Sequence, residues 1–302
     1  MGRSAGWTRW RAWSKEHARN RRTRLHWWKE TLELETLADL DKTLARVEAA
    51  LRERQQQGRT GKTLANYAEA LAAFCSWCVR LGYLRDDPLK AMTTIDTTPQ
   101  TRRRAISPEE IPRPLQVCPA HRRLLLDTAF MSGLRANELR HLTPAHIDFE
   151  RGGLILEAEW TKNRKDGLQP LPDDLLRRVQ AFAESGEPAR LYAALYRRKD
   201  AESDTPEDPL LYVPTHPARE FDKDLEAAGI PKVTPQGKLD FHACRLAYIN
   251  LVIENGASIK EAQELARHST PQLTMNVYGR VRQERLAQTV DKVADALRQA
   301  AE

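Results

Sequence analysis

The stretch Gly133-Leu134-Arg135-Ala136-Asn137-Glu138-Leu139 joins the end of a predicted helix to two charged side chains. We predict a helix over residues 120–132, and Gly133 is typical of the residue that closes a helix in the left-handed conformation. Arg135 and Glu138 follow, one helical turn apart. An arginine after such a glycine is most often a surface ion pair. This stretch therefore indicates a site only in combination with motifs elsewhere in the chain.

Three further polar motifs follow in order. Thr161-Lys162-Asn163-Arg164-Lys165 lies in the turn of a predicted hairpin, and His242-Ala243-Cys244-Arg245 lies at the start of a helix predicted over 241–254. His268 is followed ten residues later by Tyr278. Each motif alone is weak, because a His and an Arg three residues apart usually share a solvated helix face and a single tyrosine is usually packing. Their order and spacing together are specific.

Together the motifs resemble those of the tyrosine recombinases, also called phage-type integrases. The matching patterns are Gly-Leu-Arg-x-x-Glu-Leu, Thr-Lys-Asn, His-x-x-Arg and His-Ser-(x)8-Tyr, in the order of the family. The resemblance covers about residues 105–300. It extends more weakly to residues 63–88, where Leu64, Tyr67, Phe74 and Trp77 are spaced as in the family's core-binding domain.

The chain departs from the family pattern at several positions. The middle motif usually reads His-x-Leu-Arg-His, whereas here Cys244 and Leu246 stand at the Leu and second His positions. Arg267 stands where a glycine commonly precedes the later histidine. The spacing from His268 to Tyr278 is one residue longer than in many members, but no other tyrosine follows in the chain.

The resemblance implies three groups that handle protons and the covalent bond. Tyr278 is the nucleophile that attacks a DNA phosphodiester and forms a 3′-phosphotyrosine. Lys162, on the hairpin, protonates the leaving 5′ oxygen. His242 accepts the tyrosine proton or adds a hydrogen bond.

The resemblance also implies a set of groups that stabilise the transition state. Arg135 and Arg245 grip the non-bridging phosphate oxygens, because a planar guanidinium binds such oxygens bidentately. His268 adds a hydrogen-bond donor. Glu138 orients Arg135 or a neighbouring side chain.

The predicted chemistry needs no cofactor and no metal, because the phosphotyrosine conserves the energy of the phosphodiester bond. Gly61-Lys62-Thr63 resembles the end of a phosphate-binding loop, but Gln56 replaces the required glycine. Cys75 and Cys78 form one Cys-x-x-Cys pair without a second pair, inside an apolar helix where buried thiols are ordinary. His141 and His146 are five residues apart and do not share a helical face well. We therefore predict no metal site.

The excess of positive charge lies in the N-terminal third of the chain. Residues 1–104 carry 21 Lys and Arg against 12 Asp and Glu, whereas the whole chain carries 48 against 42. Such an excess favours a polyanionic partner, because docking on phosphates releases condensed counterions, although a solvated basic face is a common alternative. We predict that this part contacts DNA, with candidate contacts at Arg59, Lys62, Arg102, Arg103 and Arg104.

The expected fold is mainly α-helical, with two domains that clamp duplex DNA. A helical core-binding domain is predicted over 1–95, a basic linker over 96–107, and an α+β catalytic domain with a small hairpin or sheet over 108–302. Its last helix, predicted over 282–300, has an apolar stripe of Leu286, Val290, Val293 and Leu297. Near the N-terminus, Trp7, Trp10 and Trp13 form an aromatic stripe.

Composition indicates the cellular compartment in which the protein acts. Hydrophobic residues make up 41% of the 302 residues, enough to form cores. Apolar runs are too short to span a bilayer, and the N-terminus lacks the pattern of a signal peptide. Four cysteines are too few for a disulfide framework. We expect a cytoplasmic, nucleoid-associated protein of prokaryotic or phage origin, without a membrane partner.

The predicted function is site-specific recombination of double-stranded DNA, as in integration or excision of a mobile element. The resemblance implies a homotetramer on DNA, in which the last helix packs on a neighbouring subunit; packing within its own chain is the alternative. Accessory DNA-bending or directionality proteins are possible partners. Two other functions stay open: a type IB topoisomerase that relaxes supercoils, and a DNA-binding protein with a silent active site.

Overall fold

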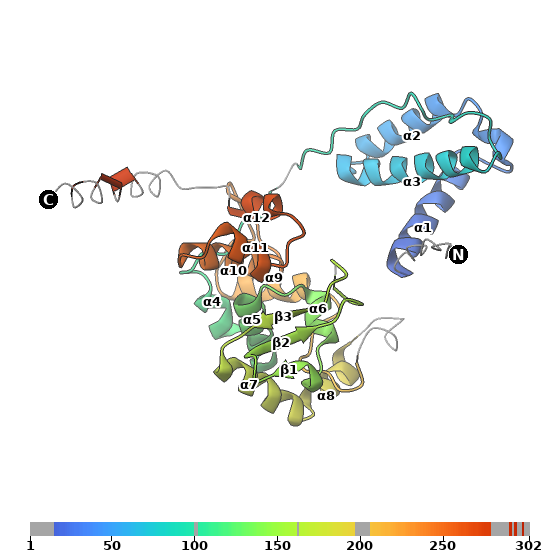
Figure 1. Ribbon diagram of the computed structural model, residues 1–302. Helices are drawn as coiled ribbons and strands as arrows, with labels where there is room; N and C mark the ends of the chain where they lie inside the picture. Colours follow the sequence, from blue (N-terminus) through green and yellow to red (C-terminus); the bar gives the residue numbers. More distant parts are fainter. Residues whose placement is uncertain are drawn as a thin grey trace, which may run out of the picture. The chain divides into compact units, whose positions relative to one another are not determined.

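The computed structural model describes residues 15–99, 102–161, 163–196 and 206–278, and single positions at 290, 291, 293, 294 and 298. The chain forms two compact units, Met1–Thr101 and Arg102–Glu302, each visible in Figure 1. The tryptophan stripe near the N-terminus, Lys162 and most of the predicted last helix lie outside the described residues. None of the helices in the described ranges is long and apolar enough to cross a bilayer.

Within the described residues of the first unit there are three α-helices, α1 (Lys15–Thr31), α2 (Leu44–Gln56) and α3 (Gly61–Arg80), and a 3₁₀ helix η1 (Leu37–Leu40) after α1. Trp28 of α1 is fully buried in their core, and its indole N–H donates to the Tyr67 carbonyl oxygen at 2.8 Å. The segment between η1 and α2 is not helical, and Lys42 within it adopts a positive φ of 57°.

The Gly61-Lys62-Thr63 motif is the start of α3. The hydroxyl of Thr60 accepts a hydrogen bond from the Thr63 backbone N–H at 3.3 Å, as a helix N-cap does. A Cβ on Gly61 would lie 1.8 Å from the Asp96 carbonyl oxygen. The glycine is therefore needed for the close approach of a later segment of the same unit.

The second unit begins with α4 (Pro112–Val117), α5 (Ala120–Ser132), α6 (Ala136–His141) and the 3₁₀ helix η2 (Pro144–His146). A three-stranded antiparallel sheet follows, in the order β1 (Ile147–Asp148), β2 (Gly153–Leu156), β3 (Gly167–Pro170). Leu154 pairs with Gln169 and Ile155 with Leu168, so the predicted hairpin is present. Its polar turn spans the residues between β2 and β3.

The remaining elements of this unit are helical apart from one small hairpin. They are α7 (Asp173–Glu184), α8 (Glu187–Leu195), α9 (Pro217–Ala227), β4 (Val233–Thr234), β5 (Gly237–Lys238), α10 (Ala243–Glu254), α11 (Ile259–Leu265) and α12 (Pro271–Tyr278). The predicted helix over 120–132 coincides with α5, and Ser258 and Glu261 form a capping box at the start of α11. The prediction of a mainly helical fold with a small sheet is confirmed.

Residues 102–107 belong to the predicted linker, but in the structure they pack within the second unit. Arg103 bridges Lys238 in parallel orientation, and a Cβ on Gly237 would lie 2.5 Å from the Arg102 carbonyl oxygen. Ile106 is buried in the core of this unit. These contacts join residues more than a hundred positions apart, so local composition could not reveal them.

Candidate active site

Arg135 and Glu138 are positioned by the turn between α5 and α6. Gly133 closes α5 with φ 61°, and a Cβ there would lie 2.5 Å from a ring carbon of Tyr248. Arg135 then caps α6. Its backbone N–H donates to Oε2 of Glu138 at 2.8 Å, and its Nη1 donates to Oε1 at 2.8 Å. The Glu138 side chain is 2% exposed and that of Arg135 is 26% exposed, so the arginine is the group that a ligand can reach.

Arg245 connects three helices around the same point. It lies on α10 and is buried. Its Nη1 donates to the Gly133 carbonyl oxygen at 2.5 Å, and its Nη2 donates to the carbonyl oxygen of Ala266, which follows α11. Burial, reinforced by the positive charge of Arg135, lowers the pKa of Arg245 to about 9. The guanidinium is still charged at neutral pH.

His242 lies immediately before α10, where its backbone N–H donates to Oδ1 of Asp240 at 2.9 Å. Burial lowers the pKa of its imidazole to about 4, and the positive charges of Arg245 and Arg103 act in the same direction. The ring is therefore neutral at pH 7. One of its nitrogens can accept a hydrogen bond while the other donates.

His268 and Tyr278 are linked by α12. The Nδ1 atom of His268 lies 2.9 Å from the hydroxyl oxygen of Thr274, which is buried. The α12 helix packs on α10 and α11, and Tyr278 is its last residue. The helix therefore ties the position of the predicted nucleophile to the elements that carry Arg245 and His268. The side chain of Tyr278 lies outside the description.

The turn that contains Lys162 is closed by its neighbours, although Lys162 itself lies outside the described residues. Thr161 is buried, and its hydroxyl donates to the Lys165 carbonyl oxygen at 3.0 Å. Asp166 accepts a hydrogen bond from the Ala158 backbone N–H at 2.6 Å. The sequence motif did not reveal that Thr161 and Asp166 stabilise this turn. Both have short polar side chains, which commonly form hydrogen bonds with the backbone in turns.

Arg267 is a site residue that sequence reasoning noted only as a departure from the family pattern. Its Nη2 donates to Oε2 of Glu138 at 2.7 Å, across 129 positions of sequence. Its backbone has a positive φ of 50°, a conformation that glycine adopts readily. A charged residue in place of glycine was the available signal, but its partner could not be read from the sequence.

The predicted DNA contacts divide into exposed and paired groups. Arg59, Lys62 and Arg102 are exposed. Arg103 pairs with Asp240 at 2.7 Å and stays 61% exposed. Arg104 forms two hydrogen bonds to the Glu110 carboxylate, at 2.6 and 3.0 Å, with its side chain only 12% exposed. Its charge is thus paired with a carboxylate within the second unit.

Two other features of the described residues carry no recognisable chemistry. The cysteines of the Cys-x-x-Cys pair are free and buried, and burial raises the pKa of the Cys75 thiol to about 12. Over the described part of the chain, no three His, Cys, Asp or Glu side chains are grouped so as to hold a metal ion.

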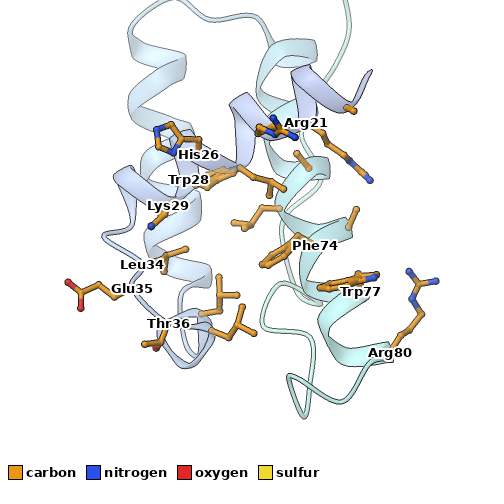
Figure 2. Close-up of a pocket in the computed structure, with 18 residues that line it drawn as sticks. Arg21, His26, Trp28, Lys29, Leu34, Glu35, Thr36, Phe74, Trp77 and Arg80 are labelled. Atoms are coloured by element: carbon orange, nitrogen blue, oxygen red, sulfur yellow. The ribbon is translucent and has the colours of Figure 1, made fainter. Parts of the chain in front are cut away.

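A groove of about 880 Å³ lies in the first unit, between α1 and α3. Figure 2 shows Trp28, Phe74 and Trp77 along it, with Arg21 and Arg80 among its labelled lining residues. Its lining is mainly apolar and includes none of the predicted catalytic residues. The groove is therefore separate from the cluster around Glu138.

Comparison with known proteins places the second unit in a described family. The model of the phage integrase family matches residues 104–285. The chain is 28% identical over 197 residues to tyrosine recombinase XerA of Thermococcus onnurineus, a stretch that covers 64% of each protein. It is 26% identical over 270 residues to a tyrosine recombinase XerC-like protein of Caldanaerobacter subterraneus, covering 80% of this chain and 68% of that protein. The match therefore spans just under two thirds of the length of XerA.

Solved structures share the fold at low sequence identity. A lambda integrase (75–356) dimer bound to a COC′ core site superposes with a TM-score of 0.65 at 19% identity, covering 90% of this chain and 92% of that one. The Tn1549 transposon integrase in complex with transposon right-end DNA gives a TM-score of 0.63 at 17% identity, covering 94% and 96%. These similarities establish the fold.

Proposed function

The chain belongs to the phage integrase family, whose model matches residues 104–285, and we propose that it is a site-specific recombinase that cuts and rejoins duplex DNA. Cleavage proceeds through a covalent 3′-phosphotyrosine, and rejoining reverses the same step. The substrate is a pair of specific attachment sites, and the biological result is integration or excision of a mobile element. The names of the curated relatives, all tyrosine recombinases, support this proposal.

The convergence of Arg135 and Arg245 is the observation that carries the proposal. The two guanidiniums come from residues 110 positions apart, and Arg245 donates to the carbonyl of Gly133, two residues before Arg135. A phosphodiester has one negative charge, and attack by an oxygen nucleophile adds a second in the transition state. Two preorganised guanidiniums stabilise the added negative charge. Removal of one such donor typically lowers a rate by about 10²–10³.

Tyr278 supplies the oxygen that attacks phosphorus, and the 5′ oxygen of the next nucleotide leaves. The phenol proton passes to an acceptor, for which His242 is the candidate. Its imidazole is neutral in the free protein, and a bound phosphate would raise its pKa toward neutrality because opposite charge favours the protonated form. His268 donates a hydrogen bond to the phosphate, and Lys162 protonates the departing oxygen.

The active assembly in this proposal is a homotetramer on DNA. A lambda integrase tetramer bound to a Holliday junction has the same fold as this chain, with a TM-score of 0.65 at 19% identity over 88% of this chain and 72% of that one. In this chain, Val290 and Val293 of the predicted last helix are 67% and 55% exposed. A neighbouring subunit would cover this stripe.

In this proposal the protein acts in the cytoplasm, on attachment sites within the nucleoid. Accessory DNA-bending or directionality proteins act on the same sites.

Covalent trapping tests the proposal. Duplexes that bind the protein would be selected from a random pool and converted to nicked suicide substrates, on which religation is blocked. The wild-type chain should form a protein–DNA adduct on a denaturing gel, and Tyr278→Phe should form none while keeping its affinity for DNA. Adducts that persist in the variant would disprove the nucleophile. No adduct with the wild type would favour a silent DNA-binding protein, and site-independent relaxation of supercoils would favour a topoisomerase.

A further inference from the structure

Arg267 occupies a backbone position that does not favour a side chain. It follows α11 directly and has φ 50°. Residues with a Cβ are disfavoured in this left-handed region because the Cβ crowds the following carbonyl oxygen. A non-glycine residue held there is a reason to ask what its side chain contributes.

The side chain of Arg267 shares a buried carboxylate with Arg135. Its Nη2 lies 2.7 Å from Oε2 of Glu138, and Nη1 of Arg135 lies 2.8 Å from Oε1. The side chains of Arg267 and Glu138 are 11% and 2% exposed. The Nε and Nη1 atoms of Arg267 are buried without a hydrogen-bond partner among the described residues. Glu138 is thus the carboxylate with which Arg267 pairs in the described part of the chain.

The charge of the cluster depends on this contact. Arg135, Arg245 and Arg267 contribute three positive charges and Glu138 contributes one negative charge. The cluster therefore has a net charge of two positive. Without Arg267, Arg135 would be the one ion-pair partner of the buried Glu138 among the described residues, and a charge that is neutralised by its own partner interacts less with a phosphate.

We propose that Arg267 is a positioning residue of the active site, which neutralises Glu138 so that Arg135 presents its full positive charge to the DNA phosphate. This inference rests on the proposed function. The phosphate has one negative charge in the substrate and two in the transition state. A greater positive charge on the cluster attracts the transition state more strongly than the substrate, so the effect of Arg267 falls more on the cleavage rate than on affinity.

The test compares two substitutions that keep the same backbone strain. Arg267→Lys keeps the positive charge, whereas Arg267→Gln removes it and keeps a hydrogen-bond donor. Single-turnover adduct formation on the suicide duplex, binding to the same duplex and thermal melting are measured for each. R267Q should cleave about tenfold more slowly, less than the loss of a direct phosphate donor, with binding changed less than the rate. R267K should recover most of the rate.

The double variant Glu138→Gln with Arg267→Gln separates charge from structure. If Arg267 acts by neutralising Glu138, removal of the carboxylate restores charge to Arg135, and E138Q/R267Q cleaves faster than R267Q alone. If Arg267 only supports the fold, the two losses add, and the double variant is slower than either single variant. A double variant slower than R267Q, or an R267Q variant as fast as wild type, would overturn the inference.

A measurement without DNA keeps this result distinct from failure of the proposed function. The pKa of the Glu138 carboxyl, followed by NMR, should rise in R267Q. Burial alone raises this pKa, and Arg267 is the strongest of the charges and hydrogen bonds that hold it below its usual range. An unchanged pKa would overturn the charge pairing. Absence of adducts with the wild type would instead overturn the recombinase proposal, and with it the effect on cleavage.

Discussion

At the scale of single residues, the site is held by hydrogen bonds from charged side chains to backbone and to one carboxylate. Arg245 donates to the carbonyls of Gly133 and Ala266, and Glu138 accepts from Arg135 and Arg267. The contacts of Arg245 are buried and those of Glu138 are partly buried, so water competes poorly for them. The guanidiniums are therefore oriented before a ligand binds, which is the condition for strong electrostatic stabilisation of a transition state.

Lys162→Ala should be badly impaired on normal DNA and largely restored on DNA with sulfur at the 5′ bridging position of the cleaved bond. An alkoxide needs a proton to leave, whereas a thiolate does not, because a thiol titrates near about 8.5. Single-turnover cleavage of both substrates is the measurement. Arg135→Ala is the control and should not be restored. Equal defects of the lysine variant on both substrates would exclude Lys162 as the acid, and Arg164 and Lys165 would then be tested.

His242 should make the stability of the free protein fall as the pH decreases from 6.5 to 4. Its folded pKa is about 4, whereas an unfolded histidine titrates near about 6.5. The unfolded state therefore binds the proton first, and acid favours unfolding, by up to about 3 kcal/mol. Thermal melting of wild type and His242→Gln at pH 7 and pH 4.5 measures this effect. The wild type should lose more stability than the variant; equal losses would contradict the low pKa.

At the scale of elements, helix ends build the site. The end of α5 supplies the Gly133 carbonyl, the start of α6 supplies Arg135, and the start of α10 follows His242. Tyr248, one turn further along α10 than Arg245, packs against Gly133 and accepts a hydrogen bond from Gln169 of β3 at 3.2 Å. The sheet and α10 are thereby fixed relative to each other.

Gly133→Ala should destabilise the fold and lower the cleavage rate. The methyl group would lie 2.5 Å from the Tyr248 ring at φ 61°, so the left-handed conformation and the clash each cost about 1–2 kcal/mol or more. Gly186→Ala is the matched control in the same unit, with φ 69° and no atom within 4 Å of the added Cβ. Urea unfolding of both variants isolates the clash. If the two variants are equally stable, close packing at Gly133 is not important.

At the scale of the whole molecule, the two parts of the chain differ in net charge. The first 104 residues have an excess of nine positive charges, from 21 basic and 12 acidic residues. Arg59 and Lys62 at the start of α3 are exposed, so their charges are available to a polyanion. In the second unit, several arginines are neutralised by carboxylates, as Arg122 is by Asp224. Affinity for DNA should therefore depend strongly on the first unit.

Binding to cognate duplex should weaken steeply with salt, with log K falling by about 0.9 per phosphate contact for each unit of log salt. The double variant Arg59→Gln with Lys62→Gln should reduce this slope by up to about 2 and should weaken binding to all sequences alike. Fluorescence anisotropy at several salt concentrations measures the slope. Arg104→Gln is the control, because Glu110 already pairs with that arginine, and its slope should not change. A flat salt response of the wild type would contradict the DNA clamp.

The sequence alone determined the mainly helical fold and several of its helices, and it predicts a set of site residues. The α5 helix with its closing glycine and the capping box of α11 depend on neighbours within a few positions, so local patterns predict them. Arg135, Arg245, His268 and Tyr278 are predicted as site residues because their spacing resembles that of a family. Only the tertiary structure decided which charged side chains form ion pairs. Glu138 pairs with Arg267 across 129 positions, and Arg104 pairs with Glu110. An ion pair depends on the path of the chain between its partners, and that path is set by packing of the core, which no local pattern encodes.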